Sequence, residues 1–263
     1  MTKLLPPIMG KQQYILSLIY TYRFLNRTQI QTLLKHKDKR RILVWLKDLR
    51  EKDYLKWQYD LNDFISKSKP AIYYLSLNGI RHLKSLDRYP NTELKKRYKD
   101  GTRSESFINQ SILIADCCIT LESSNTEHII YNYVLEADYL DPNSTYHYLN
   151  DLGPSLYFTK TIKDKNSNDD TAVQYLLEIF NETTPRYKVK RKLEMYIELV
   201  EEDETNQQIV LLAFPSVSEL LYAKRRVKLL SENLDEDTTS KIRFATTDKI
   251  KQVGVAGEIW EEV

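Results

Sequence analysis

Residues 26–52 have the sequence NRTQIQTLLKHKDKRRILVWLKDLREK, which predicts two helices joined by a short turn. Asn26 and Gln29 have the spacing of a variant capping box, so we expect the first helix to begin after Asn26. Residues 35–38 form the turn, and the side chain of Asp38 can cap the second helix. This segment is therefore typical of a helix-turn-helix.

The second of these helices, which we expect to run to about Lys52, has two different faces. Ile42, Leu46 and Leu49 fall within one narrow arc when each residue advances by about 100°, and this arc is expected to be core. Basic residues and one valine lie on and beside the opposite arc, as on a helix that enters the major groove of DNA. The expected DNA contacts are Lys37, Arg40, Arg41, Val44 and Lys47.

The flanking segments complete a winged helix-turn-helix. Apolar residues at helical spacing over 12–24 predict a supporting first helix. Two aromatic and β-branched runs, 54–59 and 71–76, predict a β-hairpin, or wing, and residues 77–86 predict a closing helix. Basic residues at the wing tip are placed to contact backbone phosphates. These expected wing contacts are Lys67 and Lys69.

The charge is divided unevenly along the chain. Residues 1–104 contain 23 lysines and arginines against 9 aspartates and glutamates, a net charge of +14, whereas residues 105–263 contain 16 against 28, a net charge of −12. Such asymmetry indicates a segment that faces nucleic acid beside a segment with another task. We expect a DNA-binding domain over 1–86, a basic linker over 87–104 and an acidic α/β domain over 105–263.

Composition excludes several other classes of protein. No apolar run approaches the roughly 20 residues needed to cross a bilayer, and residues 1–10 lack the features of a signal peptide, so we expect a cytoplasmic protein without a membrane partner. Cys117 and Cys118 lie in an apolar helical pattern, which favours buried free thiols. The four histidines show no zinc-site spacing, and no glycine-rich nucleotide motif is present. No cofactor is expected.

The acidic half alternates strand and helix patterns. Strands are predicted over 155–162 and 172–180, a long amphipathic helix over 185–201, and a further strand over 208–214. This order predicts a mixed sheet covered by helices, so the fold class of the whole chain is α+β.

A few residues in this layout carry a family resemblance. They are Tyr73, Tyr74, Leu75 and Gly79 after the wing, Pro154 before a strand, Leu177, Glu178 and Ile179 in the next strand, and Lys192 and Tyr196 in the helix beyond. With these residues in this order, the chain resembles the replication-relaxation family of plasmids and integrative elements. The resemblance implies an N-terminal winged helix and a C-terminal domain similar to PD-(D/E)xK nucleases.

The chain departs from an active nuclease of that kind at two positions. An active enzyme supplies an Asp after the proline and a (D/E)xK motif on the next strand, because two carboxylates hold Mg²⁺ while a lysine orients the attacking water. Here Ser155 follows Pro154, and Phe180 stands where the strand lysine would be. The resemblance therefore implies a degraded nuclease fold without catalysis.

Glu178 has two open interpretations. As an edge-of-strand carboxylate it pairs with Lys192 or Arg186. As a metal ligand it works with Asp151 or Glu182 and with a lysine from the helix beyond. The candidate helix lysines are Lys188, Lys190 and Lys192. We favour the ion pair.

The expected function is sequence-specific binding of double-stranded DNA by a mobile-element protein, acting in plasmid replication or conjugative transfer at an origin. The alternatives are a Mg²⁺-dependent DNA nuclease that uses Glu178 and a winged-helix transcriptional regulator. A replication or transfer protein and a second copy of the chain are possible partners, since dimers normally recognise paired half-sites. The apolar residues that could form a dimer surface or belong to the core are Leu220, Leu221, Val227 and Leu229.

Overall fold

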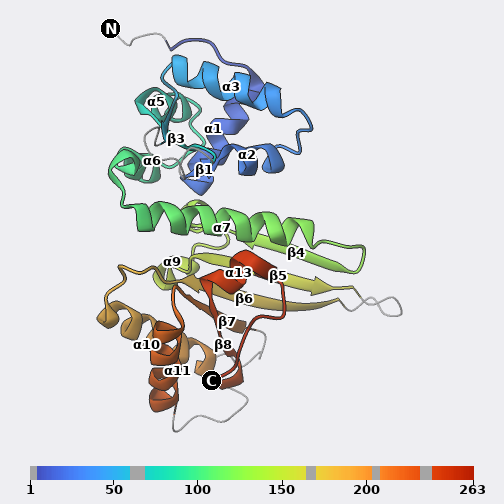
Figure 1. Ribbon diagram of the computed structural model, residues 1–263, viewed down its shortest axis with the longest axis vertical. Coiled ribbons are helices and arrows are strands. Elements are labelled where there is room, and N and C mark those ends of the chain that lie inside the picture. Colours follow the sequence, from blue (N-terminus) through green and yellow to red (C-terminus); the bar gives the residue numbers. More distant parts are fainter. Residues whose placement is uncertain (1–4, 60–68, 164–169, 203–207, 232–238) are drawn as a thin grey trace. The chain divides into compact units, whose positions relative to one another are not determined.

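The chain folds into two compact units in a computed structural model that describes residues 5–59, 69–163, 170–202, 208–231 and 239–263. Unit 1 is Met1–Ala115 with Leu140–Pro142, and unit 2 is Asp116–Tyr139 with Asn143–Val263. The helix α7 (Glu105–Ser123) begins in unit 1 and ends in unit 2 (Figure 1). Each unit is described separately below.

Unit 1 contains the predicted winged helix. Its elements in chain order are α1 (Gly10–Tyr22), β1 (Leu25–Asn26), α2 (Arg27–Leu33), α3 (Lys39–Glu51), β2 (Leu55–Gln58), β3 (Ile72–Leu75) and α5 (Leu77–Lys84). The three strands form an antiparallel sheet in the order β1-β3-β2, in which Tyr73 of β3 pairs with Leu25 and with Trp57. The buried residues of α1, α2 and α3 supply the core beside this sheet.

The predicted helix caps are present and explain where the two central helices begin. Asn26 accepts a hydrogen bond from the backbone N–H of Gln29 at 3.0 Å, while the backbone N–H of Asn26 donates to the Gln29 side chain at 2.9 Å. Asp38 accepts from the backbone N–H of Arg40 at 2.8 Å. Because these bonds satisfy donors that a helix leaves unpaired at its start, they fix the first turn of α2 and of α3.

Gly79 allows α5 to lie directly against the chain that enters β2. A Cβ atom at this position would lie 2.3 Å from the backbone oxygen of Tyr54, well inside any normal contact. The same oxygen accepts a hydrogen bond from the backbone N–H of Ser76 at 3.0 Å, and Ser76 caps α5. A side chain at residue 79 would therefore push the closing helix away from the hairpin.

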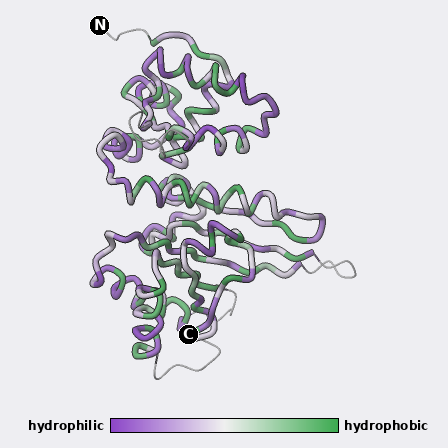
Figure 2. Tube along the Cα trace, in the orientation of Figure 1, coloured by the Kyte–Doolittle hydropathy of each residue, from purple (hydrophilic) through white to green (hydrophobic). Residues whose placement is uncertain are grey.

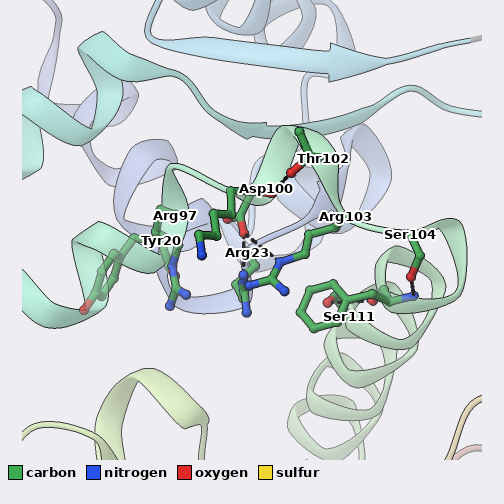
Figure 3. Close-up of polar contacts among 10 residues, drawn as sticks. Tyr20, Arg23, Arg97, Asp100, Thr102, Arg103, Ser104 and Ser111 are labelled. Carbon is green, nitrogen blue, oxygen red and sulfur yellow. Dashed lines mark hydrogen bonds and ion pairs between the residues drawn. The ribbon is translucent and has the colours of Figure 1, made fainter. Parts of the chain in front are cut away.

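Residues 87–104, expected to be a linker, are instead folded into unit 1. They contain α6 (Asn91–Arg97) and a short 3-10 helix, η1 (Asp100–Thr102). Arg97 is 1% exposed and Asp100 is fully buried. Asp100 pairs with Arg23 from the end of α1, and Arg97 Nε donates to the backbone oxygen of Tyr20 at 3.1 Å (Figure 3).

The basic composition of this segment predicted a linker, but buried ion pairs give it a fixed structure. Arg103 lies 4.0 Å from Asp100, and the guanidinium groups of Arg23 and Arg103 both lie over the ring of Phe107. A buried charge is tolerated only where it is paired or hydrogen-bonded, and the cluster meets this condition around Asp100. The boundary between the units therefore falls at Ala115 rather than before it.

Unit 2 is built on a mixed five-stranded sheet, as predicted. The strands are β4 (Ile129–Val134), β5 (Leu156–Ile162), β6 (Thr171–Ile179), β7 (Gln208–Phe214) and β8 (Ile242–Thr246), in the spatial order β4-β5-β6-β7-β8. The strand β5 is antiparallel to both of its neighbours, β4 and β6, whereas β6, β7 and β8 are parallel. Hydrophobic residues recur along these strands (Figure 2), and most of β7 is buried.

Helices complete unit 2. They are α8 (Glu136–Tyr139), α9 (Leu149–Leu152), α10 (Arg186–Glu202), α11 (Val217–Leu230) and α13 (Thr247–Val253). The helix α10 connects β6 to β7, and α11 connects β7 to β8, as parallel strands require a crossover. Of the predicted dimer residues on α11, Leu220 and Val227 are buried in the core, whereas Leu221 and Leu229 are exposed.

Two further expectations concern the apolar helices. Cys117 and Cys118 of α7 are buried free thiols, as predicted, and burial raises the pKa of the Cys117 thiol. Among the helices in the described ranges, none has both the length and the apolar character needed to cross a membrane.

Candidate nucleic-acid interface and the Glu178 cluster

The exposed side of α3, called the α3 face below, carries the predicted DNA contacts. Arg40, Arg41, Val44 and Lys47 are all exposed, and so is Lys37 in the preceding turn. Val44 is 63% exposed although it is a β-branched apolar residue. The opposite arc, formed by Ile42, Trp45, Leu46 and Leu49, is buried. The structure thus places Arg40, Arg41, Val44 and Lys47 on the exposed side of one helix, with Lys37 in the turn before it.

The two arginines of the α3 face are available to an external ligand. The backbone N–H groups of Arg40 and Arg41 donate hydrogen bonds to Asp38, which caps α3, but their side chains take no part in this cap. In the described ranges neither guanidinium forms an ion pair. Lys47 lies 3.7 Å from Glu51, but both side chains are mostly exposed, so this pair contributes little to stability. The α3 face therefore presents two guanidinium groups that no carboxylate of the described ranges neutralises.

Sequence patterns missed a second group of exposed residues close to α3. Leu43 is 44% exposed and follows the two arginines on α3. Arg50 near the end of α3 lies over the ring of Trp57 in β2, with its Cζ 3.2 Å from the ring centroid. Trp57 is 39% exposed and stacks with Tyr59. The alternation of β2 alone would place Trp57 inward with Leu55, but the ring is exposed and covered on one side by Arg50.

The wing is described only in part. The strands β2 and β3 form the predicted hairpin, and Lys69 is exposed just before β3. Lys67 lies outside the described residues. Between β2 and α3 the surface is hollowed, and the hollow of about 370 Å³ is lined partly by Arg50, Lys56 and Trp57.

A second polar group, the Glu178 cluster, consists of Ser155, Glu178, Lys192 and Tyr196 in unit 2. Glu178 near the end of β6 is 8% exposed. Its Oε2 lies 2.9 Å from Lys192 Nζ and accepts a hydrogen bond from Tyr196 Oη at 2.8 Å. Its Oε1 accepts from Ser155 Oγ at 3.2 Å. The predicted ion pair between Glu178 and Lys192 is therefore present.

The cluster also ties three elements together. Ser155 Oγ accepts a hydrogen bond from the backbone N–H of Ile179 at 3.0 Å, which joins the start of β5 to the end of β6. Lys192 of α10 donates to the backbone oxygen of Gly153 at 2.9 Å. Tyr196 is almost fully buried, and this burial, together with the adjacent Glu178 carboxylate, raises the pKa of the phenol well above its usual range.

The other residues considered for a nuclease site lie elsewhere. Asp151 on α9 and Glu182 after β6 are exposed, and so is Lys188. Lys190 lies 3.5 Å from Glu194, one turn along α10. Arg186, the other predicted partner of Glu178, lies over the ring of Tyr222 instead.

These positions do not fit a two-carboxylate Mg²⁺ site. Both oxygens of Glu178 already accept hydrogen bonds or an ion pair from the protein, and the side chain at Oε1 is the hydroxyl of Ser155, not a second carboxylate. Across the ranges that the structure describes, His, Cys, Asp and Glu side chains form no group of three that could hold a metal ion.

Comparison with known proteins identifies one family. The family model described as Replication-relaxation matches residues 16–212, which covers the winged helix and most of the sheet of unit 2. Among curated proteins, none matches the chain.

Two solved structures show distant similarity. The zinc-responsive MarR family member ZitR of Lactococcus lactis is 20% identical, with 36% of this chain and 73% of that chain covered and a TM-score of 0.24. The adhesin competence repressor AdcR of Streptococcus pyogenes is 18% identical, with 36% and 78% covered and a TM-score of 0.22. Similarities of this size carry no argument about function.

Proposed function

Because the chain belongs to the replication-relaxation family, we propose that it is a sequence-specific double-stranded DNA-binding protein of a mobile element that acts at a replication or transfer origin. The observation that carries the proposal is the α3 face. Two exposed arginines, Arg40 and Arg41, lie beside an exposed valine on the second helix of a winged helix-turn-helix. An α-helix fits the major groove, where every base pair presents a distinct pattern.

The side chains of the α3 face match the chemistry of base edges. An arginine can donate two hydrogen bonds to the O6 and N7 atoms of guanine, and an apolar side chain such as Val44 can contact the thymine methyl group. Lys37 at the start of the face suits a backbone phosphate, as does Lys69 of the wing. Arg50, held flat on Trp57, would add a positioned cation beside the wing.

Unit 2 has a different role in this proposal. The order of its main elements, α7, the antiparallel strands β4 to β6, α10 and β7, with the short helices α8 and α9 between β4 and β5, supports the likeness to PD-(D/E)xK nucleases. The Glu178 cluster, however, uses the key carboxylate in a structural ion pair. We propose that unit 2 does not cut DNA and serves for dimerisation or for recruiting a replication or transfer protein. Leu221 and Leu229 are exposed on α11 and available for such a contact.

The test is binding of the full chain to labelled DNA fragments from its own genetic neighbourhood, with scrambled competitor and with and without Mg²⁺. Selective binding without cleavage, abolished in an Arg40→Ala/Arg41→Ala variant, supports the proposal. The matched control, Arg225→Ala/Lys228→Ala, removes two exposed charges from α11 and should bind normally. Footprinting then separates an origin from an operator, and a site beside a promoter would favour a transcriptional regulator.

Two outcomes would overturn the proposal. Absence of selective binding would remove the DNA-reading role of α3. Mg²⁺-dependent cutting that Glu178→Ala abolishes would replace the non-catalytic role of unit 2 with nuclease activity.

A further inference from the structure

One face of the sheet in unit 2 carries a groove that the winged helix does not use. The groove has a volume of about 300 Å³, at the lower end of the roughly 300–1,000 Å³ of small-molecule pockets. Its lining combines aromatic and charged side chains of the strands with the segment that follows α13. The residues used below, called the sheet groove, are Tyr131, Phe158, Lys160, Tyr175, Arg243 and Trp260.

The strand register places these side chains on the same face. Tyr131 of β4 pairs with Lys160 of β5, and Phe158, two residues before Lys160, pairs with Tyr175 of β6. At the opposite edge of the sheet, Arg243 of β8 pairs with Leu211 of β7, which also lines the groove. Because side chains alternate between faces along a strand, paired residues and residues two apart point the same way. The groove therefore crosses the sheet from edge to edge.

Two aromatic rings of the groove, Tyr175 and Trp260, are partly exposed and have fixed orientations. Phe158 is buried and stacks behind Tyr175, with ring centroids 4.7 Å apart and planes 8° from parallel. Tyr175 itself is partly exposed, as is Trp260. The indole N–H of Trp260 donates to the backbone oxygen of Val255 at 3.0 Å, which fixes the orientation of the ring. A flat ligand thus meets aromatic rings that are already ordered.

Two cations lie among these rings. Lys160 and Arg243 are both partly exposed, and within the described ranges neither forms an ion pair; Arg243 Nε reaches the backbone oxygen of Ser240 at 3.4 Å. Glu258 is the carboxylate that lines the same groove. The groove therefore has a net positive charge within a half of the chain whose net charge is −12. The local positive charge of the groove favours an anionic ligand.

We propose that the sheet groove binds an unpaired nucleotide of single-stranded DNA, with the base against Tyr175 and Trp260 and the flanking phosphates near Lys160 and Arg243. Single-strand binding uses this combination of stacking surfaces and a cationic track, and stacking is open to any base because every base has a π-face. A paired base is covered by its neighbours, so duplex DNA cannot make the same contact. The inference goes beyond the duplex-binding role of the α3 face.

The first experiment measures binding of the full chain to a fluorescent oligothymidine of about ten nucleotides, within the range of single-strand site sizes. Lys160→Ala/Arg243→Ala should weaken this binding by tenfold or more and lower the salt slope by roughly 1.4, about 0.7 for each phosphate that the variant no longer neutralises. The matched control is Arg225→Ala/Lys228→Ala on α11, which should leave both quantities unchanged. Glu258→Gln should tighten binding.

The second experiment locates the base. Oligothymidine carrying 5-bromouracil should cross-link on irradiation to peptides that contain Tyr175 or Trp260. Tyr175→Leu should weaken binding by about fivefold or more, since it removes one stacking partner, whereas Tyr175→Phe should retain the affinity. If Tyr175→Leu does not fold, the identity of the cross-linked peptide tests the position of the base instead.

The proposal is overturned if oligothymidine does not bind, if the groove and control double variants bind it equally, or if the cross-link lies in unit 1. The Arg40→Ala/Arg41→Ala variant separates this proposal from the duplex-binding one. It should lose selective duplex binding and keep the oligothymidine affinity.

Discussion

The helices α3 and α10 both carry basic residues, but they use them in opposite ways. On α3, Arg40 and Arg41 are exposed, and their guanidinium groups make no ion pair in the described ranges. On α10, Lys192 is drawn into a buried cluster and pairs with Glu178 at 2.9 Å. The difference shows that the number of cations on a helix says little about its ligand. The deciding factor is whether a carboxylate of the protein already pairs with these cations.

The largest effect should follow from breaking the pair in unit 2. Lys192→Met leaves Glu178 nearly buried without its cation and should lower the free energy of unfolding by about 2–3 kcal/mol, somewhat less than for a fully buried pair. Denaturant unfolding followed by circular dichroism measures this loss. Lys190→Met, at an exposed pair with Glu194, is the matched control and should change stability by less than about 0.5 kcal/mol. Equal effects would contradict the difference between the nearly buried pair and the exposed pair on α10.

The next effect concerns the exposed cations of α3. Arg40→Ala or Lys47→Ala should weaken specific duplex binding by about 1–3 kcal/mol if the side chain contacts a base at two points. Both residues are exposed, so stability should stay unchanged. Titration of labelled duplex measures the affinity. Unchanged affinity in both variants would mean that another face of α3, or another element, meets the DNA.

A smaller effect should come from the cap that begins α2. Asn26→Ala removes the acceptor for the Gln29 backbone N–H and should destabilise unit 1 by about 1 kcal/mol. Hydrogen exchange resolved by peptide should show faster exchange in α2 and α3, with unit 2 unaffected. Asn26→Asp retains a capping oxygen and is the control. Faster exchange throughout unit 2 would contradict the division into two units.

The smallest effect is expected at the wing. Lys67→Ala/Lys69→Ala should weaken binding to all duplex sequences alike and lower the salt slope by roughly 1.8, about 0.9 for each phosphate contact. Affinity measured at several salt concentrations gives this slope. A preserved slope would reject the phosphate role of these lysines and leave the α3 face as the DNA contact of unit 1.

Most of the secondary structure was predictable because local signals agreed with one another. Asn26 and Asp38 begin the helices at the expected positions, and the apolar arc of α3 is buried as its spacing predicted. Order along the chain also predicted the mixed sheet, and the ion pair between Glu178 and Lys192 was one of two predicted pairings. These features depend on neighbours close in sequence or on a motif order that the family shares.

Features that depend on distant neighbours were missed. Arg97 and Asp100 looked like surface charges, because nothing local shows that Arg23 and Tyr20 meet them in the interior. The sheet groove needs all five strands and the segment after α13 to exist at all. Trp57 was assigned to the hairpin, but its stacking with Arg50 joins two elements whose contact the sequence does not encode locally.

The Glu178 cluster also restricts how this protein can change over generations. Loss of Lys192 alone leaves the nearly buried Glu178 carboxylate without its cation. Loss of Glu178 alone still leaves Lys192 with the backbone oxygens of Leu152 and Gly153 as acceptors, so Lys192 is the costlier of the two residues to replace. An aspartate at residue 155 would bring a second negative charge to the Glu178 oxygen that Ser155 now contacts. A pair of carboxylates that could bind a metal would therefore need several substitutions in a permitted order. In evolutionary terms Glu178 and Lys192 are epistatically coupled, because the effect of replacing one residue depends on the presence of the other.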